Sequence, residues 1–342
     1  MQVSLNSVRQ GQVSRRVKCC IIVSGVHRSG TSAVARLVNL LGADIGGDLL
    51  PKNRNNCRGY WESQSVVNIH ANLLKAVGTV ADPFDPAPLR ADWLTTGFAR
   101  EAKSRLADRI QSEFAASHVF VVKDPRISRL LPLWVELLSD LKIAPVVVVP
   151  FRNPLEVVAS LAQRDGLPPP KTLLLYFHAY LQTEYSSRSV PRMFVRYDGL
   201  LEDWRPFAGQ LAQISRACLS SPAGEVAKEI DEFLTTTLHH HRFSRAQMMG
   251  QPGISAEIIE MFDLMDSTAR TGDDHMLRAA FDRFRADADA ATRLYRGFVM
   301  AELGDLRREI VRQRQTFETS TSWRVTAPLR WLKSNVLAKI GV

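Results

Sequence analysis

The chain has 342 residues, of which 45% are hydrophobic and 23% charged, a composition typical of folded proteins that excludes disorder as its main state. No apolar run approaches the roughly 18 residues of a membrane span, and the first 18 residues lack the apolar core of a secretory signal. A cytoplasmic location is therefore expected. The net charge of +9 favours anionic partners such as nucleotides, anionic sugars or lipid surfaces. Nucleic acid is not an expected partner, because the sequence has neither zinc-finger spacing nor the basic and aromatic pattern of an RNA-binding sheet.

Apolar, β-branched runs alternate with helical patterns along the first two thirds of the chain. The runs lie at 17–25, 118–124, 144–151 and 191–197. The helical patterns lie at 30–41, 64–77, 97–116, 127–141, 153–164, 171–187 and 199–216. Because each run is apolar on both faces, it suits an inner strand of a parallel sheet. This order predicts a doubly wound α/β domain that binds its ligand beyond the carboxyl ends of the strands.

The first strand runs into a glycine turn in "IIVSGVHRSGTSAVARLVNLLG", residues 21–42. Gly25 and Gly30 have the spacing of a Walker phosphate-binding loop, in which backbone N–H groups and a helix start hold an anion. Thr31 stands where such a loop has its lysine, so triphosphate hydrolysis is not expected. Arg28 offers a planar, permanently charged set of donors within the turn.

A second strand, turn and helix occur in "VVVVPFRNPLEVVASLAQR", residues 146–164. Arg152 lies at the exit of the strand, and Ser160 lies two turns into the helix that Asn153 and Pro154 begin. Arg152 and Ser160 can converge on a second phosphate, one or two strand spacings from the first loop. Taken alone, the segment is also compatible with a surface ion pair at Arg152 and simple packing at Ser160.

Together, "GVHRSGTSAVARLV", "FRNPLEVVASL" and "RMFVRYDGLLEDW" resemble sulfotransferases that use 3′-phosphoadenosine 5′-phosphosulfate (PAPS), in the bacterial branch related to carbohydrate and tyrosylprotein sulfotransferases. The resemblance covers roughly residues 18–240 and implies a P-loop-type α/β fold with PAPS as co-substrate and no metal. It places Arg28, Ser29, Gly30, Thr31 and Ser32 at the 5′-phosphosulfate and Arg152 and Ser160 at the 3′-phosphate. The hormone-type cytosolic branch matches less well, because it has lysine at the position of Arg28 and an "RKG" motif that is missing here.

Sulfuryl transfer to a hydroxyl also needs a base, for which the family uses a glutamate or histidine. The segment "RGYWESQSVVNIH", residues 58–70, offers Glu62 and His70. Glu62 is preferred, because the neighbouring Tyr60 and Trp61 can stack on a sugar ring. The alternatives are a helix-start carboxylate at Glu62 and a packed or surface histidine at His70. The expected acceptor is a hydroxyl of a saccharide or glycolipid.

A third strand-to-helix turn, "VVKDPRISRLLPLW" at 121–134, places Lys123 and Asp124 on the ligand side of the sheet. The resemblance makes Lys123 a candidate catalytic residue that contacts donor or acceptor, with Asp124 orienting it. The alternative is a Walker B aspartate that binds magnesium, which would make the protein a small-molecule kinase. A sulfotransferase-like binding module without activity is a third possibility.

The remainder of the chain predicts a helical C-terminal extension. The expected organisation is a flexible basic N-terminus at 1–16, the α/β domain at 17–245, a connector at 246–275, a long helix at 276–318 and a basic amphipathic tail at 319–342. Apolar residues of the long helix recur at alternating steps of four and three, with one phase shift, which is typical of a coiled-coil seam. The seam can pack on the α/β domain or self-associate, and the tail can contact an anionic membrane surface or its own protein.

Overall fold

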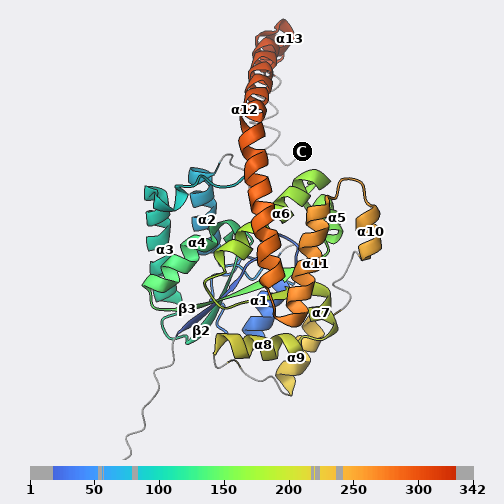
Figure 1. Ribbon diagram of the computed structural model, residues 1–342. Helices are drawn as coiled ribbons and strands as arrows, with labels where there is room; N and C mark the ends of the chain where they lie inside the picture. Colours follow the sequence, from blue (N-terminus) through green and yellow to red (C-terminus); the bar gives the residue numbers. More distant parts are fainter. Residues whose placement is uncertain are drawn as a thin grey trace, which may run out of the picture. The chain divides into compact units, whose positions relative to one another are not determined.

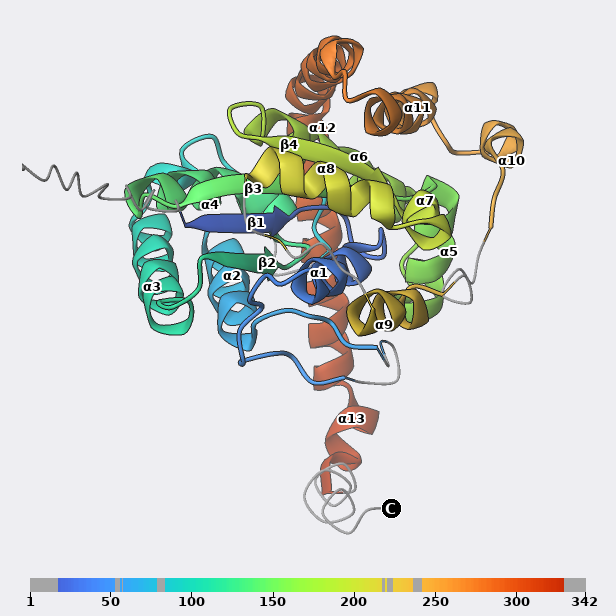
Figure 2. The same ribbon diagram turned by 90° about the horizontal axis from the view of Figure 1, so that it is seen from below.

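The computed structural model describes residues 18–52, 56, 58–78, 84–216, 219, 224–235 and 242–328. Within this part of the chain, drawn in Figure 1, four parallel strands form one sheet, and Figure 2 labels them in their order β2-β1-β3-β4. They are β1 (Cys19–Val23), β2 (Val119–Lys123), β3 (Ala144–Phe151) and β4 (Arg192–Arg196). The predicted strands and the α/β fold class are thus confirmed. The chain leaves β1 toward β2 and then crosses back to β3, so the topological switch point lies between β1 and β3.

The helices occupy most of the segments that the sequence predicts. They are α1 (Thr31–Leu40), α2 (Gln64–Val77), α3 (Gly97–Glu113), α4 (Ile127–Asp140), α5 (Pro154–Asp165), α6 (Pro169–Ser186), α7 (Tyr197–Glu202), α8 (Arg205–Ser215), α9 (Glu225–Phe233), α10 (Arg245–Gly250), α11 (Ala256–Thr271), α12 (His275–Thr319) and α13 (Thr321–Val325), with a 3-10 turn at η1 (Trp93–Thr95). The helix predicted over 199–216 is two helices. Pro206 has no N–H to donate to a preceding turn, so it fits the start of α8 and not the middle of a longer helix.

Both faces of the sheet are covered by helices, which explains why its strands are apolar on both sides. Ile21, Val121 and Val148 point to one face, where they join a buried cluster with Leu37 of α1 and Leu211 of α8. On the other face α4 contacts β3, and α6 packs against α4 and α5. Figure 2 shows the sheet between these two groups of helices.

The chain divides into two compact units, Met1–Asp282 and Arg283–Val342. Within the first unit, ion pairs fix the beginning of α12. Arg192 Nη2 lies 2.6 Å from Asp274 and 3.0 Å from Glu184, and Arg188 Nη2 lies 2.7 Å from Asp282. Because Glu184 is buried, these pairs are screened from water less than surface pairs are.

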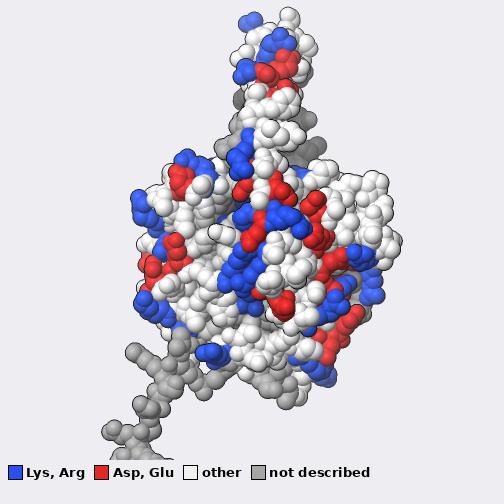
Figure 3. All heavy atoms as spheres, in the orientation of Figure 1, with Lys and Arg blue, Asp and Glu red and all other residues white. Residues whose placement is uncertain are grey.

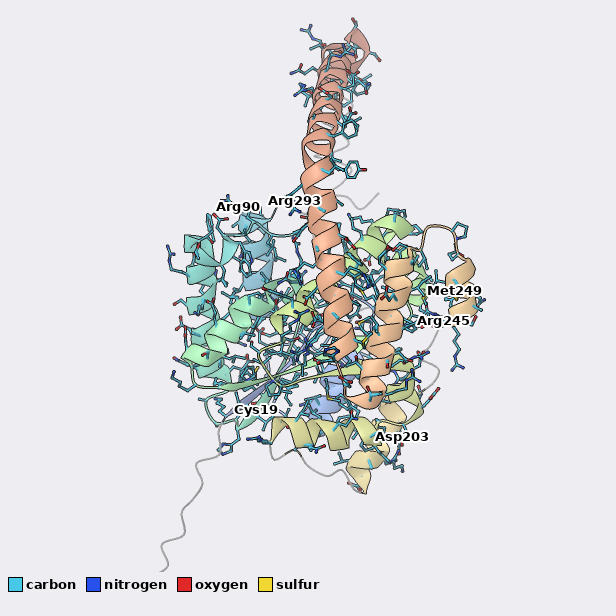
Figure 4. All side chains as sticks on the ribbon, in the orientation of Figure 1. Cys19, Arg90, Asp203, Arg245, Met249 and Arg293 are labelled. Carbon is cyan, nitrogen blue, oxygen red and sulfur yellow. The ribbon has the colours of Figure 1, made fainter. Side chains whose placement is uncertain are left out.

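Surface ion pairs join other helices of the first unit. Arg245 of α10 forms a bidentate pair with Asp263 of α11, and Arg245 and Met249 are marked on α10 in Figure 4.

Among the described helices, none is long and apolar enough to cross a bilayer. The N-terminus, Cys57, Cys218, residues 236–241 and the tail beyond 328 lie outside the described residues.

Candidate active site

A cavity of about 480 Å³ opens at the carboxyl ends of the strands, where the fold predicts a ligand. Its described lining residues are His27, Arg28, Gly30, Thr31, Ser32, Ala33, Leu50, Asn56, Arg58, Gly59, Tyr60, Glu62, Val67, Phe84, Lys123, Pro125, Arg126, Arg152, Arg164, Asp165, Tyr197 and Phe233. Six of these side chains are cationic and two are carboxylates. The cavity is therefore suited to an anion of several charges.

The turn after β1 is held close to its neighbours by glycine. Gly30 has φ +98°, and a Cβ there would lie 2.4 Å from the ring of Tyr197. A Cβ on Gly25 would lie 2.8 Å from the carbonyl oxygen of Pro150 in β3. The first position requires left-handed backbone and the second requires a missing side chain, so both glycines are explained by geometry.

Gly30→Ala is expected to destabilise the protein by about 1–3 kcal/mol, because alanine is strained at this φ and its methyl group would collide with Tyr197. Thermal unfolding would measure this loss of stability. Gly209→Ala is the matched control: its Cβ meets nothing within 4 Å in α8, and alanine favours the helix. Equal stability of the two variants would show that the turn tolerates a side chain.

Within this turn the hydroxyl residues have different surroundings. Ser29 is fully buried, and its Oγ donates to the carbonyl of Val26 at 2.7 Å, so its side chain shapes the loop and does not line the cavity. Thr31 and Ser32 line the cavity at the start of α1, where backbone N–H groups are available to an anion. Ser32 Oγ donates to the carbonyl of Tyr60 at 3.2 Å.

The two anion-binding motifs meet across the switch point. Arg28 Nε donates to Ser160 Oγ at 2.7 Å, which joins the loop after β1 to the helix after β3. Arg152 lines the same cavity, with Nε 2.5 Å from Glu156 Oε2 and its guanidinium 5.1 Å from the ring centre of Tyr197. Arg28 and Arg152 line the cavity, whereas Ser160 is buried and is not among the described lining residues.

The arginines of this cavity repel one another. Burial lowers the pKa of Arg28, and the positive charges of Arg164 and Arg152 lower it further. Arg164 lies on α5 four residues after Ser160 and therefore on the same helix face. A bound polyanion would relieve this repulsion.

At the other side of the cavity, Lys123 and Glu62 form a buried ion pair. Lys123 Nζ lies 2.5 Å from Glu62 Oε1, and it also donates to Ser32 Oγ and to the carbonyl of Tyr60, each at 3.1 Å. Burial raises the pKa of Glu62, Lys123 opposes that shift, and the net pKa lies above the ordinary value. A carboxylate with a raised pKa is better matched to accept a proton near neutral pH.

Trp61 sets the direction of this pair. Its φ of +56° is rare for a bulky residue, and it turns the chain between Tyr60 and Glu62. The Trp61 ring lies under Arg36, 4.7 Å from its guanidinium carbon, and is partly buried against the core cluster that contains α1 residues. Trp61 therefore does not line the cavity, whereas Tyr60 does, and the predicted sugar-stacking pair is reduced to Tyr60.

His70 is fully buried and does not reach the cavity. Trp134 Nε1 donates to its Nε2 at 2.9 Å, so the proton of the ring is on Nδ1, which donates to Asp124 Oδ2 at 2.9 Å. Because both ring nitrogens are engaged, His70 cannot take a proton from an acceptor. Its position makes it a support for Asp124, and of the two predicted base candidates only Glu62 is among the described lining residues of the cavity.

Asp124 orients Arg126 and not Lys123. Its Oδ1 accepts from the backbone N–H and from Nη1 of Arg126, both at 3.0 Å. Burial alone would raise the pKa of Asp124, but bonds from His70 and Arg126 outweigh burial and hold it below the ordinary value. The carboxylate is fully buried and lies outside the cavity lining, so it is not placed as a Walker B ligand.

Ser32 provides a second test of the kinase interpretation. It occupies the position at which a P-loop serine or threonine binds Mg²⁺. Here Lys123 Nζ lies 3.1 Å from the Ser32 hydroxyl, so an ammonium group is where the metal would bind. An Mg²⁺ ion bound by Ser32 would therefore have to displace the ammonium group of Lys123.

Several cavity residues were not singled out from the sequence. Tyr197 directly follows β4, so its place at a strand end could have revealed it. Arg164 lies four residues after Ser160 on the same face of α5, so helical spacing could have revealed it. Arg58 donates to the carbonyl of Phe233 at the end of α9, a contact that spacing does not reveal. His27 is half-buried, and burial together with Arg164 and Arg126 lowers its pKa to about 3.

No protein-family model and no curated protein match this chain. Solved structures that are similar to this chain include three bacterial or biosynthetic proteins. The first is a sulfotransferase domain from the curacin biosynthetic pathway, with 12% identity and a TM-score of 0.39 over 72% of this chain and 98% of that one. The second is a sulfotransferase domain from the Synechococcus PCC 7002 olefin synthase, with 14% identity and a TM-score of 0.40 over 72% of this chain and 94% of that one. The third is sulfotransferase STF1 from Mycobacterium tuberculosis H37Rv, with 14% identity and a TM-score of 0.42 over 71% of this chain and 76% of that one. Each of the three is described as a sulfotransferase or a sulfotransferase domain. At such low identity, function has to be argued from the residues of the site itself.

Proposed function

We propose that the protein is a sulfotransferase that moves the sulfuryl group of PAPS to a hydroxyl of an acceptor. The observation that carries this proposal is the 2.7 Å bond from Arg28 Nε to Ser160 Oγ. It ties the loop after β1 to the helix after β3, beside the cavity that Arg28 and Arg152 line, so these two arginines can hold two anionic groups of one ligand. PAPS has its anionic groups at both the 5′ and the 3′ positions, whereas ATP has phosphates at the 5′ position alone.

Charge supports PAPS over a metal-bound triphosphate. PAPS carries about four negative charges near neutral pH, from one phosphate monoester and the phosphosulfate. The described lining has an excess of cationic over acidic side chains, and Lys123 contacts the hydroxyl that Mg²⁺ would need. Arg28, Ser32 and Lys123 are proposed for the 5′ side and Arg152 for the 3′ side, where Ser160 would exchange its bond with Arg28 for one with the 3′-phosphate.

The proposed reaction is an in-line displacement at sulfur. The acceptor oxygen forms a bond to sulfur while the bond from sulfur to the 5′-phosphate oxygen breaks, and the acceptor proton passes to Glu62. Negative charge grows on the departing phosphate oxygen, where Arg28, Lys123 and the N–H groups of the turn stabilise it. The raised pKa of Glu62 supports its role as the base.

A saccharide or glycolipid is the proposed acceptor. Tyr60 and Phe84 supply aromatic surface to the cavity, and Tyr60 is two residues from Glu62. An aromatic ring beside the base can pack against the apolar face of a sugar while the hydroxyl to be sulfated faces Glu62.

Arg152→Ala is expected to weaken binding of the product adenosine 3′,5′-bisphosphate by ten-fold or more and binding of AMP far less. The reason is that a charge-assisted contact, worth about 1.5–3 kcal/mol, is lost only by the ligand with a 3′-phosphate. Calorimetric titration measures both affinities. Equal loss for the two ligands would remove Arg152 from the 3′-phosphate.

Two controls accompany this measurement. Arg245→Ala removes an exposed arginine from α10, outside the cavity, and should change neither affinity. Arg152→Lys keeps a cation near Glu156, so it separates the loss of the guanidinium from the cost of removing the charged partner of a buried carboxylate. Thermal unfolding of each variant reports that cost directly.

A further inference from the structure

The second unit of the chain exposes a regular apolar seam on α12. Leu306, Ile310 and Phe317 are 62%, 57% and 58% exposed. Together with Val299, Leu303 and Gln313 they recur at steps of four and three, and we call these six positions the seam. Such spacing places the six positions along one helix face, the pattern of a two-stranded coiled coil.

The seam has the residue preferences of a parallel pair of helices. In heptad terms Leu303, Ile310 and Phe317 take position a, and Val299, Leu306 and Gln313 take position d. The central layers are thus formed by β-branched Ile310 at a and Leu306 at d. This combination favours two parallel strands over three or four.

The charges beside the seam select the same arrangement. Position g holds Glu302 and Glu309, and position e holds Arg307 and Arg314. In a parallel, in-register pair each g residue faces the e residue five positions later on the other helix, so Glu302 faces Arg307 and Glu309 faces Arg314. An antiparallel pair would oppose acid to acid and base to base. The pattern therefore attracts in one orientation and repels in the other.

We propose that a second copy of this chain covers the seam, with the two α12 helices parallel and in register. A membrane surface fits this face less well, because acidic and basic side chains are interleaved along the exposed part of α12 (Figure 3), whereas a membrane-bound helix has a mainly basic polar face. Ion pairs within one α12 helix do not compete strongly with ion pairs between two copies of it. Arg312 with Glu309 and Arg314 with Glu318 are exposed pairs, each at 2.8 Å, and such pairs contribute little.

The first test compares two adjacent aspartate substitutions in the full chain. Ile310 lies in the seam, and Val311 lies beside it outside the seam with a similar exposure of 54%. The wild type and Val311→Asp are expected to sediment as dimers over a dilution series, and Ile310→Asp as a monomer. A monomeric wild type, or the same state for both variants, would overturn the proposal. If a monomeric wild type bound anionic vesicles and Ile310→Asp did not, the face would belong to a membrane contact instead.

The second test measures orientation by disulfide formation. Gln313→Cys is made in a chain in which Cys57 and Cys218 are serine, and the protein is oxidised and run on a non-reducing gel. Parallel, in-register helices bring two copies of position 313 together, so a cross-linked dimer is expected. Val311→Cys in the same chain is the control and should remain largely uncross-linked. A dimer in solution without cross-linking at 313 would contradict the parallel arrangement.

Discussion

Glu62→Gln is expected to lower kcat by about 10²–10⁴-fold, the usual contribution of a general base, while leaving affinity for adenosine 3′,5′-bisphosphate nearly unchanged. Glutamine keeps the shape of the side chain and can still accept from Lys123, which also retains the carbonyl of Tyr60. Only the capacity to take the acceptor proton is removed. Sulfate transfer from labelled PAPS measures the loss of kcat, and calorimetric titration with the bisphosphate measures whether its affinity is retained.

The matched control is Glu136→Gln, which alters a lysine–glutamate pair on the surface. Glu136 lies 3.4 Å from Lys103, and about half of its side chain is exposed. This variant should retain full activity and stability. If Glu62→Gln were as active as this control, Glu62 would not be the base. If it lost bisphosphate binding as well, the carboxylate would be a structural partner of Lys123.

Lys123→Met is expected to lower kcat by a factor comparable to the loss of an oxyanion donor, about 10²–10³-fold, and also to move the pH profile. A base works only when deprotonated, so the rate rises with pH through the pKa of Glu62. The charge of Lys123 lowers that pKa, and its removal therefore raises it. The acid limb of the remaining activity should shift to higher pH.

Lys103→Met is the control for Lys123→Met, because Lys103 pairs with Asp140 at 2.7 Å on the surface of the same domain. It removes an equal charge without touching the cavity, and both rate and pH profile should stay unchanged. A Lys123→Met variant with a lower kcat but an unchanged acid limb would show that Lys123 does not control the pKa of the base. A shift to lower pH would contradict the assigned role of the ion pair.

The fold was largely predictable because its signals are local. Each strand is a short apolar run, and each is followed by a helix of clear periodicity. The order of the strands was not predictable in the same way, since it depends on which crossover packs on which face. The break between α7 and α8 was missed although Pro206 marks it.

The donor side of the site follows from the same local signals. Arg28 lies in the turn after β1 and Arg152 directly follows β3, and parallel strands end at one edge of the sheet. The adjacency of β1 and β3 then brings Ser160 to Arg28. By contrast, Ser29 was grouped with the ligand residues by its motif, and its buried bond to Val26 becomes evident only from the loop geometry.

The base side depends on long-range contacts that no spacing encodes. Glu62 and Lys123 are 61 residues apart, and His70 and Trp134 are 64 apart. One segment offers both His70 and Glu62, and the sequence favours Glu62 only through its aromatic neighbours. The strained turn at Trp61 directs Glu62 into the cavity, while the helix that follows directs His70 into the core. Tertiary packing therefore decided between them.

The most direct measurement is calorimetric titration of the purified protein with adenosine 3′,5′-bisphosphate, beside ATP with Mg²⁺. The arrangement of Arg28, Arg152 and Ser160 predicts tight binding of the bisphosphate and no binding of ATP with Mg²⁺. Tight binding of the metal-bound triphosphate without binding of the bisphosphate would contradict the sulfotransferase proposal. In that event, a loop without its lysine would serve a kinase.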